Sequence, residues 1–513
     1  MGTKADNQRI ARNTSFLYVR MFVVLIVSLY VSRVVLNALG VVDFGIYNVV
    51  AGFVSLFSFL EATLSGSVQR FYNYYGTTDG EPGFSKVYSV SIIISIICAA
   101  VLLLVLETAG LWYVNNVMIV PPDRLKAANI VFQCSAASFM MIFVQLPFVG
   151  MIMAKERMNF YAIVNIVEVF LKLGMALVLP QIGADKLVYY GIFMLAISLT
   201  VTLLMIIYTN RSFPFLSFSR HLDRRLSRNL LGFSGWSVVG TFAFMLKGQG
   251  INMLLNFFFG PVVNAARGVA FQVNNAVGGF SSNISVAFRP QIVNSYAAGE
   301  RERSISLMFR ESKICFTLLA IILIPVVLEI DLLLHLWLGE TIPENTQLFT
   351  VLVLVDALVC TLNTPCTQIV YATGRIKSYQ IISTVINLLL LPVCFVLLKF
   401  GYPAQGVFIL TIVFSIINQV ACFIISGSVS GFTKADYLRS VVLRCIPVAL
   451  VMIIPGIITM FMESSFLRFL VVTAATFVSA VPVVYYLVLN KNERLYVENA
   501  VSGVLRKSRK NGK

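Results

Sequence analysis

Two basic residues, Lys247 and Arg267, stand inside apolar stretches where a charge needs an anion or water beside it. They lie in FMLKGQGINMLLNFFFGPVVNAARGVAF, residues 244–271, and neither has an acidic residue within one helical turn. A cation in the middle of a membrane helix costs about 2.5 to 3.5 kcal/mol on insertion scales, and such residues normally face a bundle interior or an aqueous cavity. Gly248 and Gly250 flank the lysine and allow backbone or ligand to approach closely. We interpret the two cations as candidates for lining a substrate path.

Four other basic residues remain within apolar stretches, namely Arg20, Arg33, Lys172 and Arg444. Arg20 and Arg33 lie toward opposite ends of one predicted helix, so each can either extend its head group to the membrane surface or line a path. Lys172 follows Glu168 by four residues, which is the favourable order for an ion pair on one helix. Arg444 stands at a predicted helix start, from which its head group reaches the surface.

Uncharged polar side chains accompany the two central cations. The same two apolar stretches hold Asn252, Asn256, Gln272 and Asn275, which is more amide than helix packing usually requires. Because an amide both donates and accepts hydrogen bonds, these residues are candidate contacts for sugar hydroxyls. Asp356, inside VLVLVDALVCTLNTP, is the candidate for proton or sodium-ion coupling, and a role as partner of one of the cations explains it equally well.

The composition is that of an integral membrane protein. Of 513 residues, 58% are hydrophobic and 12% are charged, and the mean hydropathy is +0.86. Soluble domains carry about 25% charged residues. The eight cysteines all fall in apolar stretches without metal-ligand spacing, so they are interpreted as small buried side chains.

Apolar runs long enough to cross a membrane recur along the whole chain and predict about fourteen helices. We place them near 14–38, 44–68, 87–109, 127–153, 158–180, 187–209, 231–258, 262–288, 313–337, 347–371, 379–400, 405–426, 441–462 and 466–489. Lys and Arg crowd alternate loops and the C-terminal end, which predicts that both termini are cytoplasmic. The net charge of +16 is therefore a topology and anionic-lipid signal, and no nucleic-acid partner is needed to explain it.

A weak internal repeat predicts the arrangement of these helices. With a shift of 219 residues, the segment VQRFYNYYGTTDGE aligns with AFRPQIVNSYAAGERE and places Arg70 on Arg289 and Gly80 on Gly299. We expect an all-α membrane fold with two parallel six-helix lobes and an extra C-terminal pair, as in transporters that bind substrate between repeats. The predicted parts are an N-terminal lobe at 1–210, a basic cytoplasmic linker at 211–230, a C-terminal lobe at 231–430, the extra pair at 431–490 and a basic cytoplasmic tail at 491–513.

The sequence contains none of the common motifs of enzymes or ATP-driven pumps. A phosphate-binding Walker A loop, a D-x-D pair, a nucleophile elbow and an H-E-x-x-H zinc motif are all absent, and the two histidines are far apart. We expect a protein that is not an enzyme and has no cofactor or metal, apart from H⁺ or Na⁺ as a coupling ion.

Two segments resemble the polysaccharide transporters. SRVVLNALGVVDFGIYNVVAGFVSLFSFL, residues 32–60, is similar to their first helical pair, with an Arg, a Leu-Gly turn and Phe-Gly-Ile-Tyr. NAARGVAFQVNNAVGGFSSNISVAFRPQIVNSYAAGERE, residues 264–302, resembles the corresponding second-half segment of oligosaccharide flippases from Bacteroides-like bacteria. Both groups belong to the multidrug/oligosaccharidyl-lipid/polysaccharide (MOP) superfamily, whose fold, like that of the multidrug exporters called MATE transporters, has the predicted topology.

The resemblance implies a Wzx-type flippase in the plasma (inner) membrane of a bacterium. Such a protein moves an undecaprenyl-diphosphate-linked oligosaccharide to the outer leaflet by alternating access, for O-antigen, capsule or another exopolysaccharide. The family's cavity is cationic, and Lys247, Arg267, Arg20 and Arg33 occupy helices that line it, so the resemblance implies that they meet the diphosphate. The bilayer and proteins of polysaccharide polymerisation and assembly are the implied partners. A lipid II flippase and a MATE-like cation-coupled drug exporter remain alternatives.

Overall fold

The structure is a computed structural model that describes residues 4–155, 157–219, 224–489 and 494. The side chain of Arg20 and most of the predicted basic tail at 491–513 lie outside the described part of the chain. The described residues are almost entirely helical and contain no strand. The predicted all-α fold class is confirmed.

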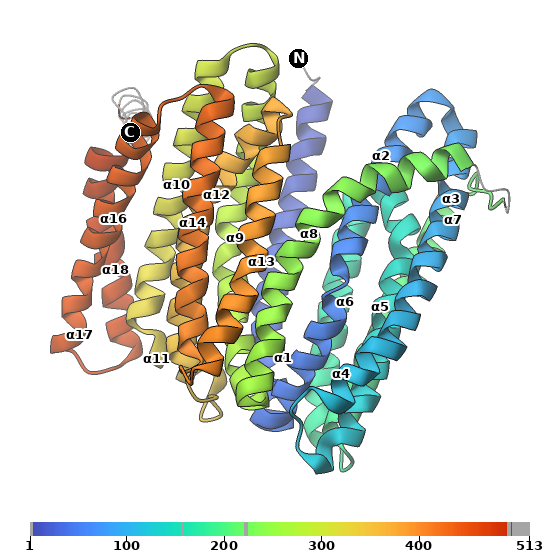
Figure 1. Ribbon diagram of the computed structural model, residues 1–513, viewed down its shortest axis with the longest axis horizontal. Helices are drawn as coiled ribbons and strands as arrows, with labels where there is room; N and C mark the ends of the chain where they lie inside the picture. Colours follow the sequence, from blue (N-terminus) through green and yellow to red (C-terminus); the bar gives the residue numbers. More distant parts are fainter. Residues whose placement is uncertain (1–3, 156, 220–223, 490–493, 495–513) are drawn as a thin grey trace, which may run out of the picture. The chain divides into compact units, whose positions relative to one another are not determined.

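The chain divides into two compact units (Figure 1). The first unit comprises residues 1–269, 337–346 and 387–407, and the second comprises 270–336, 347–386 and 408–513. The boundaries predicted at 210, 230 and 430 follow the sequence repeat, whereas the units follow packing. The predicted lobes therefore stay a prediction.

The first unit is built from the N-terminal helices. These are α1 (Lys4–Ser55), α2 (Ser58–Thr78), α3 (Gly80–Val105), α4 (Leu111–Asn116), α5 (Leu125–Ala154), α6 (Met158–Val178), α7 (Lys186–Ser212), α8 (Arg224–Phe259) and the beginning of α9 (Pro261–Ala297). A π-helical turn, η1 (Leu106–Gly110), joins α3 to α4. Within this unit α5 packs on α7, α1 on α6, and α2 on both α5 and α8.

Helix α1 contains the first predicted span and the beginning of the second. Gly40, where we expected a tight turn, has φ 78° and ψ 170°, and this break divides α1 into two segments. A residue with a Cβ rarely adopts a positive φ, so glycine is required there. The predicted second span, 44–68, is interrupted, because a short turn at 56–57 separates the end of α1 from α2.

The second unit contains most of the remaining helices. These are α10 (Arg301–Leu328), α11 (Ile330–Leu338), α12 (Thr346–Thr373), α13 (Lys377–Lys399), α14 (Gln405–Ser430), α15 (Lys434–Tyr437), α16 (Leu443–Ile453), α17 (Ile458–Phe461) and α18 (Phe466–Val483). Two π-helical turns, η4 (Leu438–Val442) and η6 (Val484–Val488), extend the last two spans. Helices α10, α16 and α18 pack on one another. The second half of α13 counts with the first unit.

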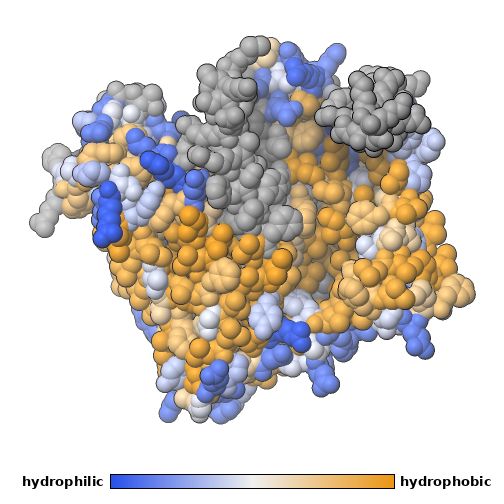
Figure 2. All heavy atoms as spheres, turned by 180° about the vertical axis from the view of Figure 1, so that it is seen from behind, coloured by the Kyte–Doolittle hydropathy of each residue, from blue (hydrophilic) through white to orange (hydrophobic). Residues whose placement is uncertain are grey.

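Eleven helical stretches within the described ranges are long and apolar enough to cross a membrane. Each of the fourteen predicted spans coincides with one helix or with a short series of helices. Helices α2, α8 and α9 are not among the eleven stretches found within the described ranges. The polar residues of α8 and α9 include Lys247, Arg267 and the candidate amides. In Figure 2 hydrophobic residues cover the middle of the helices and hydrophilic residues gather toward their ends.

Many large apolar side chains are exposed, as a lipid-facing surface requires. Leu104 on α3, Phe461 on α17 and Val478 on α18 are 67%, 82% and 72% exposed. A soluble protein rarely exposes so much contiguous apolar surface. The helices therefore belong to a multi-pass membrane protein.

Candidate functional site

The hairpin of α8 and α9 brings the two central cations to neighbouring positions. Arg267, on the second turn of α9, is 8% exposed, and its Nη2 donates to the carbonyl oxygen of Gly248 on α8 at 2.8 Å. Gly248 directly follows Lys247, whose side chain is half-buried. Lys247 interacts electrostatically with the thiol of Cys394 on α13, within the same unit. The structure thus brings both predicted residues into one region of the first unit.

A second contact between α8 and α9 lies one turn from the arginine. Asn264 on α9 donates its Nδ2 to both the carbonyl oxygen and the side-chain oxygen of Asn252 on α8, at 2.7 and 2.8 Å. Asn252 in turn donates to the carbonyl oxygen of Asn48 on α1 at 3.1 Å. Polar side chains therefore join three helices in the apolar interior, where hydrogen bonds between helices stabilise packing.

Small residues on α1 and α9 make this close approach possible. A Cβ added to Gly52 would lie 2.6 Å from the Asn252 amide nitrogen and 2.7 Å from Gln249 Oε1, and one added to Gly268 would lie 2.8 Å from Asn48 Oδ1. Both contacts are too short for a real Cβ. A Cβ at either position would displace these amide groups, so the two glycines allow the close packing of α1, α8 and α9 around the polar junction.

The candidate sugar contacts on α8 are already engaged within the first unit. Asn256 is fully buried, and its side chain accepts from the backbone nitrogen of Ile119 at 2.8 Å and donates to the carbonyl oxygen of Ile119 at 3.3 Å. Asn252 is 2% exposed and binds Asn264 and Asn48 as described. In this conformation Asn252 joins helices, and Asn256 holds the non-helical segment at Ile119 against α8. Gln272 and Asn275, in the second unit, are half-buried and exposed, and their sugar contacts stay a prediction.

Arg33 lies in another part of the first unit, beside the segment 337–346. A Cβ on Gly339 would be 3.7 Å from Arg33 Nη2. Trp337, two residues before this glycine, donates its Nε1 to the carbonyl oxygen of Leu29 at 2.7 Å. Arg33 therefore lies near this segment, and its role toward a substrate stays a prediction.

Asp356 occupies the middle of α12 in the second unit and is half-buried. The thiol of Cys360, one turn further along, approaches its Oδ2 at 4.0 Å and also approaches the hydroxyl of Ser415 at 4.0 Å. A carboxylate beside a thiol and a hydroxyl is compatible with binding a proton. The ion-coupling role predicted for Asp356 is not tested by this geometry.

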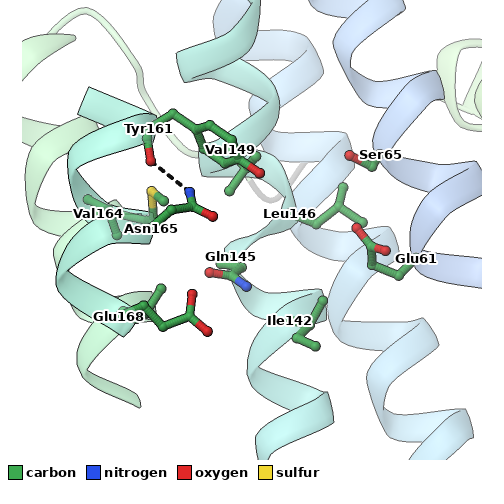
Figure 3. A pocket seen from close by; sticks show the side chains of 12 residues that line it. Glu61, Ser65, Ile142, Gln145, Leu146, Val149, Tyr161, Val164, Asn165 and Glu168 are labelled. Carbon is green, nitrogen blue, oxygen red and sulfur yellow. Dashed lines mark hydrogen bonds between the residues drawn. The ribbon is translucent and has the colours of Figure 1, made fainter. Parts of the chain in front are cut away.

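A polar cavity that sequence reasoning did not find opens among α2, α5, α6 and α7 of the first unit (Figure 3). Its volume is about 140 Å³, enough for several water molecules. Glu61 and Glu168 enter from opposite sides, with Gln145 between them (Figure 3). Asn165, beside Glu168, donates to the carbonyl oxygen of Tyr161 at 2.7 Å.

A second cavity of about 430 Å³ shares Glu61, Gln145 and Glu168 with the first and extends toward α1. Its added polar lining is Tyr47, Ser55, Ser135, Ser138, Lys172 and Ser198. The predicted pair of Lys172 and Glu168 is present, with Nζ 2.6 Å from Oε1 and both side chains about one third exposed. Two carboxylates against one ammonium leave the lining with a negative formal charge, the opposite of the region around Arg267.

The sequence offered a signal for only part of what the structure shows. The spacing of Gly45, Asn48 and Gly52 on one side of α1 could have identified a helix contact, since residues three, four and seven apart share a face. A Cβ on Gly45 would overlap the carbonyl oxygen of Pro261. The cavity around Glu61 had no such signal, because its acids come from two helices that only tertiary packing brings together.

Comparison with known proteins was made by family, by sequence and by structure. No family model matches the chain. The uncharacterized membrane protein EpsK of Bacillus subtilis (strain 168) is 20% identical over 276 residues, which are 54% of this chain and 54% of that protein. The match therefore spans about half the length of each.

Two solved transporter structures share the fold over most of the chain. The lipid II flippase MurJ, in an inward closed conformation, superimposes with a TM-score of 0.68 at 13% identity, covering 93% of this chain and 100% of MurJ. An inward-facing multidrug resistance MATE family transporter of the MOP superfamily gives 0.60 at 13% identity, covering 81% and 94%. The chain has the fold of MurJ and the MATE transporters, as expected for the MOP superfamily. These neighbours are transporters rather than enzymes.

Proposed function

We propose that this protein is a flippase that translocates an undecaprenyl-diphosphate-linked oligosaccharide across the bacterial plasma membrane for polysaccharide biosynthesis. The observation that carries the proposal is the buried Arg267, bonded to the carbonyl oxygen of Gly248 next to Lys247. A fold that it shares with a lipid II flippase supports it. Transport by alternating access, location in the inner membrane and cytoplasmic termini are parts of the same proposal.

The chemistry of a diphosphate fits this pair of cations. Phosphate oxygens accept charge-assisted hydrogen bonds from guanidinium and ammonium groups, and these are about twice as strong as neutral ones. A low local dielectric strengthens the attraction further. Arg267 is bonded within its helix hairpin, whereas Lys247 is half-buried and carries its compact ammonium on a flexible four-carbon chain, which suits a ligand that passes through.

The proposal is tested by substitution of Lys247 in a strain that lacks its polysaccharide flippase. Lys247→Ala should cost about 2 to 5 kcal/mol of substrate binding. Lys247→Arg should retain much of the surface polysaccharide, and Lys247→Glu should abolish it, because the glutamate would repel the diphosphate. The matched control is Lys399→Glu, at an exposed lysine on α13. Full complementation by Lys247→Glu at normal protein level would contradict the proposed role of this residue.

A second strain distinguishes a polysaccharide repeat unit from lipid II as the substrate. A strain dependent on lipid II transport for growth should not be rescued by the wild-type chain if its substrate is a polysaccharide repeat unit. Growth rescue together with absent polysaccharide complementation would assign lipid II instead.

A second candidate function, cation-coupled drug export, is favoured by the acidic cavity around Glu61 and Glu168 in the first unit. An organic cation would be attracted to this lining and repelled by the region around Arg267. Efflux of a fluorescent organic cation that is lost in Glu61→Gln, and unaffected by Lys247→Glu, would favour this reading over the flippase.

A further inference from the structure

One carboxyl group of the second unit is sealed from solvent. Glu311 lies on the third turn of α10, within a membrane-spanning stretch, and its relative exposure is 0%. The flippase function proposed above makes no use of it. An ionised carboxylate in such a place needs a cation or several hydrogen-bond donors.

The partners of Glu311 are neutral. Gln368 on α12 donates its Nε2 to Glu311 Oε1 at 3.0 Å. The Ser285 hydroxyl on α9 also forms a hydrogen bond with the carboxyl. No cation among the described residues acts on this carboxyl. The Gln368 amide donates in addition to the carbonyl oxygen of Ser285 at 3.3 Å, so it ties three helices together.

Two oxygen atoms in this cluster lack a hydrogen-bond partner within the described part of the chain. They are Glu311 Oε2 and Gln368 Oε1, and both are buried. Both atoms are acceptors, so neither can satisfy the other while the carboxyl is ionised. A proton on Oε2 turns that oxygen into a donor and removes the charge that the neutral surroundings do not compensate. Gln368 Oε1, on the amide that already binds Glu311, is an unused acceptor in the same cluster.

The other titratable and charged groups on the elements around Glu311 supply no counter-charge to its carboxyl. They are Arg310, Lys313 and Cys315 on α10, Arg289 on α9, Cys366 on α12, Tyr437 on α15, Arg439 in η4, and Arg444 and Cys445 on α16. Arg289, Arg310 and Arg439 are exposed, and Lys313 donates its Nζ to the carbonyl oxygen of Val488 at 2.9 Å. Cys315 Sγ lies 3.7 Å from the Ser285 hydroxyl oxygen, and a thiol supplies no positive charge.

We propose that Glu311 is a proton-binding site of the second unit, loaded in this conformation and emptied when α9, α10 and α12 separate at Ser285 and Gln368. The proposal rests on the flippase function, to which it adds the coupling ion. On release the O–H bond of the carboxyl breaks, the proton passes to water, and the carboxylate is left to be hydrated. Because a carboxylate cannot stay in the dry cluster, proton release and helix separation must occur together.

Helix α9 carries Ser285, which forms a hydrogen bond with Glu311, in the second unit, and the buried Arg267, near its beginning, in the first unit. Asp356, the residue predicted from sequence for ion coupling, takes no part in this cluster.

The proton is tested directly by infrared difference spectroscopy of the purified full-length protein. Glu311→Gln keeps the shape and both amide hydrogen bonds, so it is expected to fold. At pH 7 the wild type should show the C=O stretch of a neutral, buried carboxyl that is missing in Glu311→Gln and retained in Glu302→Gln, an exposed glutamate of the same helix. The absence of this difference band, with a carboxylate band in its place, would overturn the proposal.

Coupling is tested in proteoliposomes that contain an undecaprenyl-diphosphate-linked oligosaccharide. Translocation by the wild type and by Glu302→Gln should respond to an imposed pH gradient, and Glu311→Gln should translocate without responding. An unchanged response in Glu311→Gln would refute coupling at this residue while leaving the flippase function intact. If the wild type moves no lipid-linked oligosaccharide, the flippase function fails, and the infrared measurement still decides whether Glu311 holds a proton.

Discussion

The two units of this protein place acidic side chains in opposite surroundings. In the first unit, Glu61 and Glu168 line cavities of about 140 and 430 Å³, and Glu168 shares its charge with Lys172. In the second unit, Glu311 and Glu329 are 0% and 1% exposed. Glu61 and Glu168 of the first unit lie beside space for water, whereas Glu311 and Glu329 of the second unit are sealed within packed helices.

The arginine clusters of the two units also differ in exposure, and the cluster of the second unit is again the more buried. Arg124 in the first unit binds two acids at once: its Nε and Nη2 donate to Asp43, and its Nη1 lies 2.9 Å from Asp185, with side-chain exposures between 15% and 36%. Arg468 in the second unit binds Glu329 at 2.6 Å, with exposures of 14% and 0%. The first cluster is partly hydrated, and the second is almost dry.

This contrast shows two ways of tolerating charge among apolar helices. Where water has access, an ionised group keeps much of its hydration and can exchange partners. Where water is excluded, the group must hold a fixed partner or be neutralised by a proton. Arg468 is the fixed partner of Glu329, and we infer that Glu311 is neutralised by a proton.

The largest change in the free energy of unfolding should follow removal of Arg468, the partner in the buried ion pair. Arg468→Ala leaves Glu329 buried without its counter-charge, which should lower the free energy of unfolding by about 3 to 5 kcal/mol. Arg124→Ala removes partly hydrated pairs and should cost about 1 kcal/mol. Denaturant titration of both variants in the same detergent measures the difference.

A matched double variant separates the lost pair from lost packing. Arg468→Met combined with Glu329→Leu replaces the buried pair with apolar side chains, which is often neutral or stabilising. It should recover most of the stability that Arg468→Ala loses. Equal costs for Arg468→Ala and Arg124→Ala would show that the two clusters are equally hydrated, and the contrast between the units would be lost.

A smaller effect concerns access of water to the two polar interiors. Ser138 lines the large cavity of the first unit, and Ser285 is 8% exposed beside Glu311. On a cysteine-free background, Ser138→Cys should react quickly with a small water-soluble thiol reagent, because the cavity admits both water and the reagent. Ser285→Cys should react much more slowly, since burial in apolar surroundings disfavours the reactive form. Similar labelling rates would contradict the assignment of one wet and one dry interior.

The sequence was sufficient for the fold class and for most helix positions. Apolar runs such as 127–153 and 187–209 are long enough to identify their helices α5 and α7 almost residue by residue. The break at Gly40 was also visible, as a Leu-Gly turn. The interruption at 56–57 was not, because its residues are as apolar as their neighbours.

The candidate sites were less predictable because they depend on packing between helices. The lack of an acid near Lys247 and Arg267 on their own helices predicted that they line a substrate path, and the structure places Arg267 beside the residue that follows Lys247. The amides of Asn252 and Asn256 looked like ligand contacts, yet Asn252 binds a neighbouring helix and Asn256 binds the backbone of Ile119. Glu311 falls between the spans predicted at 262–288 and 313–337; the structure continues α10 through it.

The smallest expected effect is the response of the Arg124 cluster to acid. Asp185 precedes α7 outside the membrane spans. Burial by itself would raise its pKa, but the hydrogen bonds and charge of Arg124 outweigh burial and lower the pKa from the ordinary value of 3.8.

A carboxyl with a lowered pKa in the folded protein stabilises it above the pKa of the unfolded chain, and that stability is lost as the pH falls through the folded pKa. The contribution of Asp185 should therefore be complete at neutral pH and decline below about pH 4. Because the side chain is 36% exposed, its size should be about 1 kcal/mol or less. Asp185→Asn should lower the unfolding free energy at pH 7 by more than at pH 3, whereas Asp123→Asn, at an exposed acid on the neighbouring turn, should change little at either pH. If Asp185→Asn destabilises the protein equally at both pH values, the aspartate acts through its hydrogen bonds to Leu187 and Val188 at the start of α7, and its charge contributes nothing to the hydrated cluster.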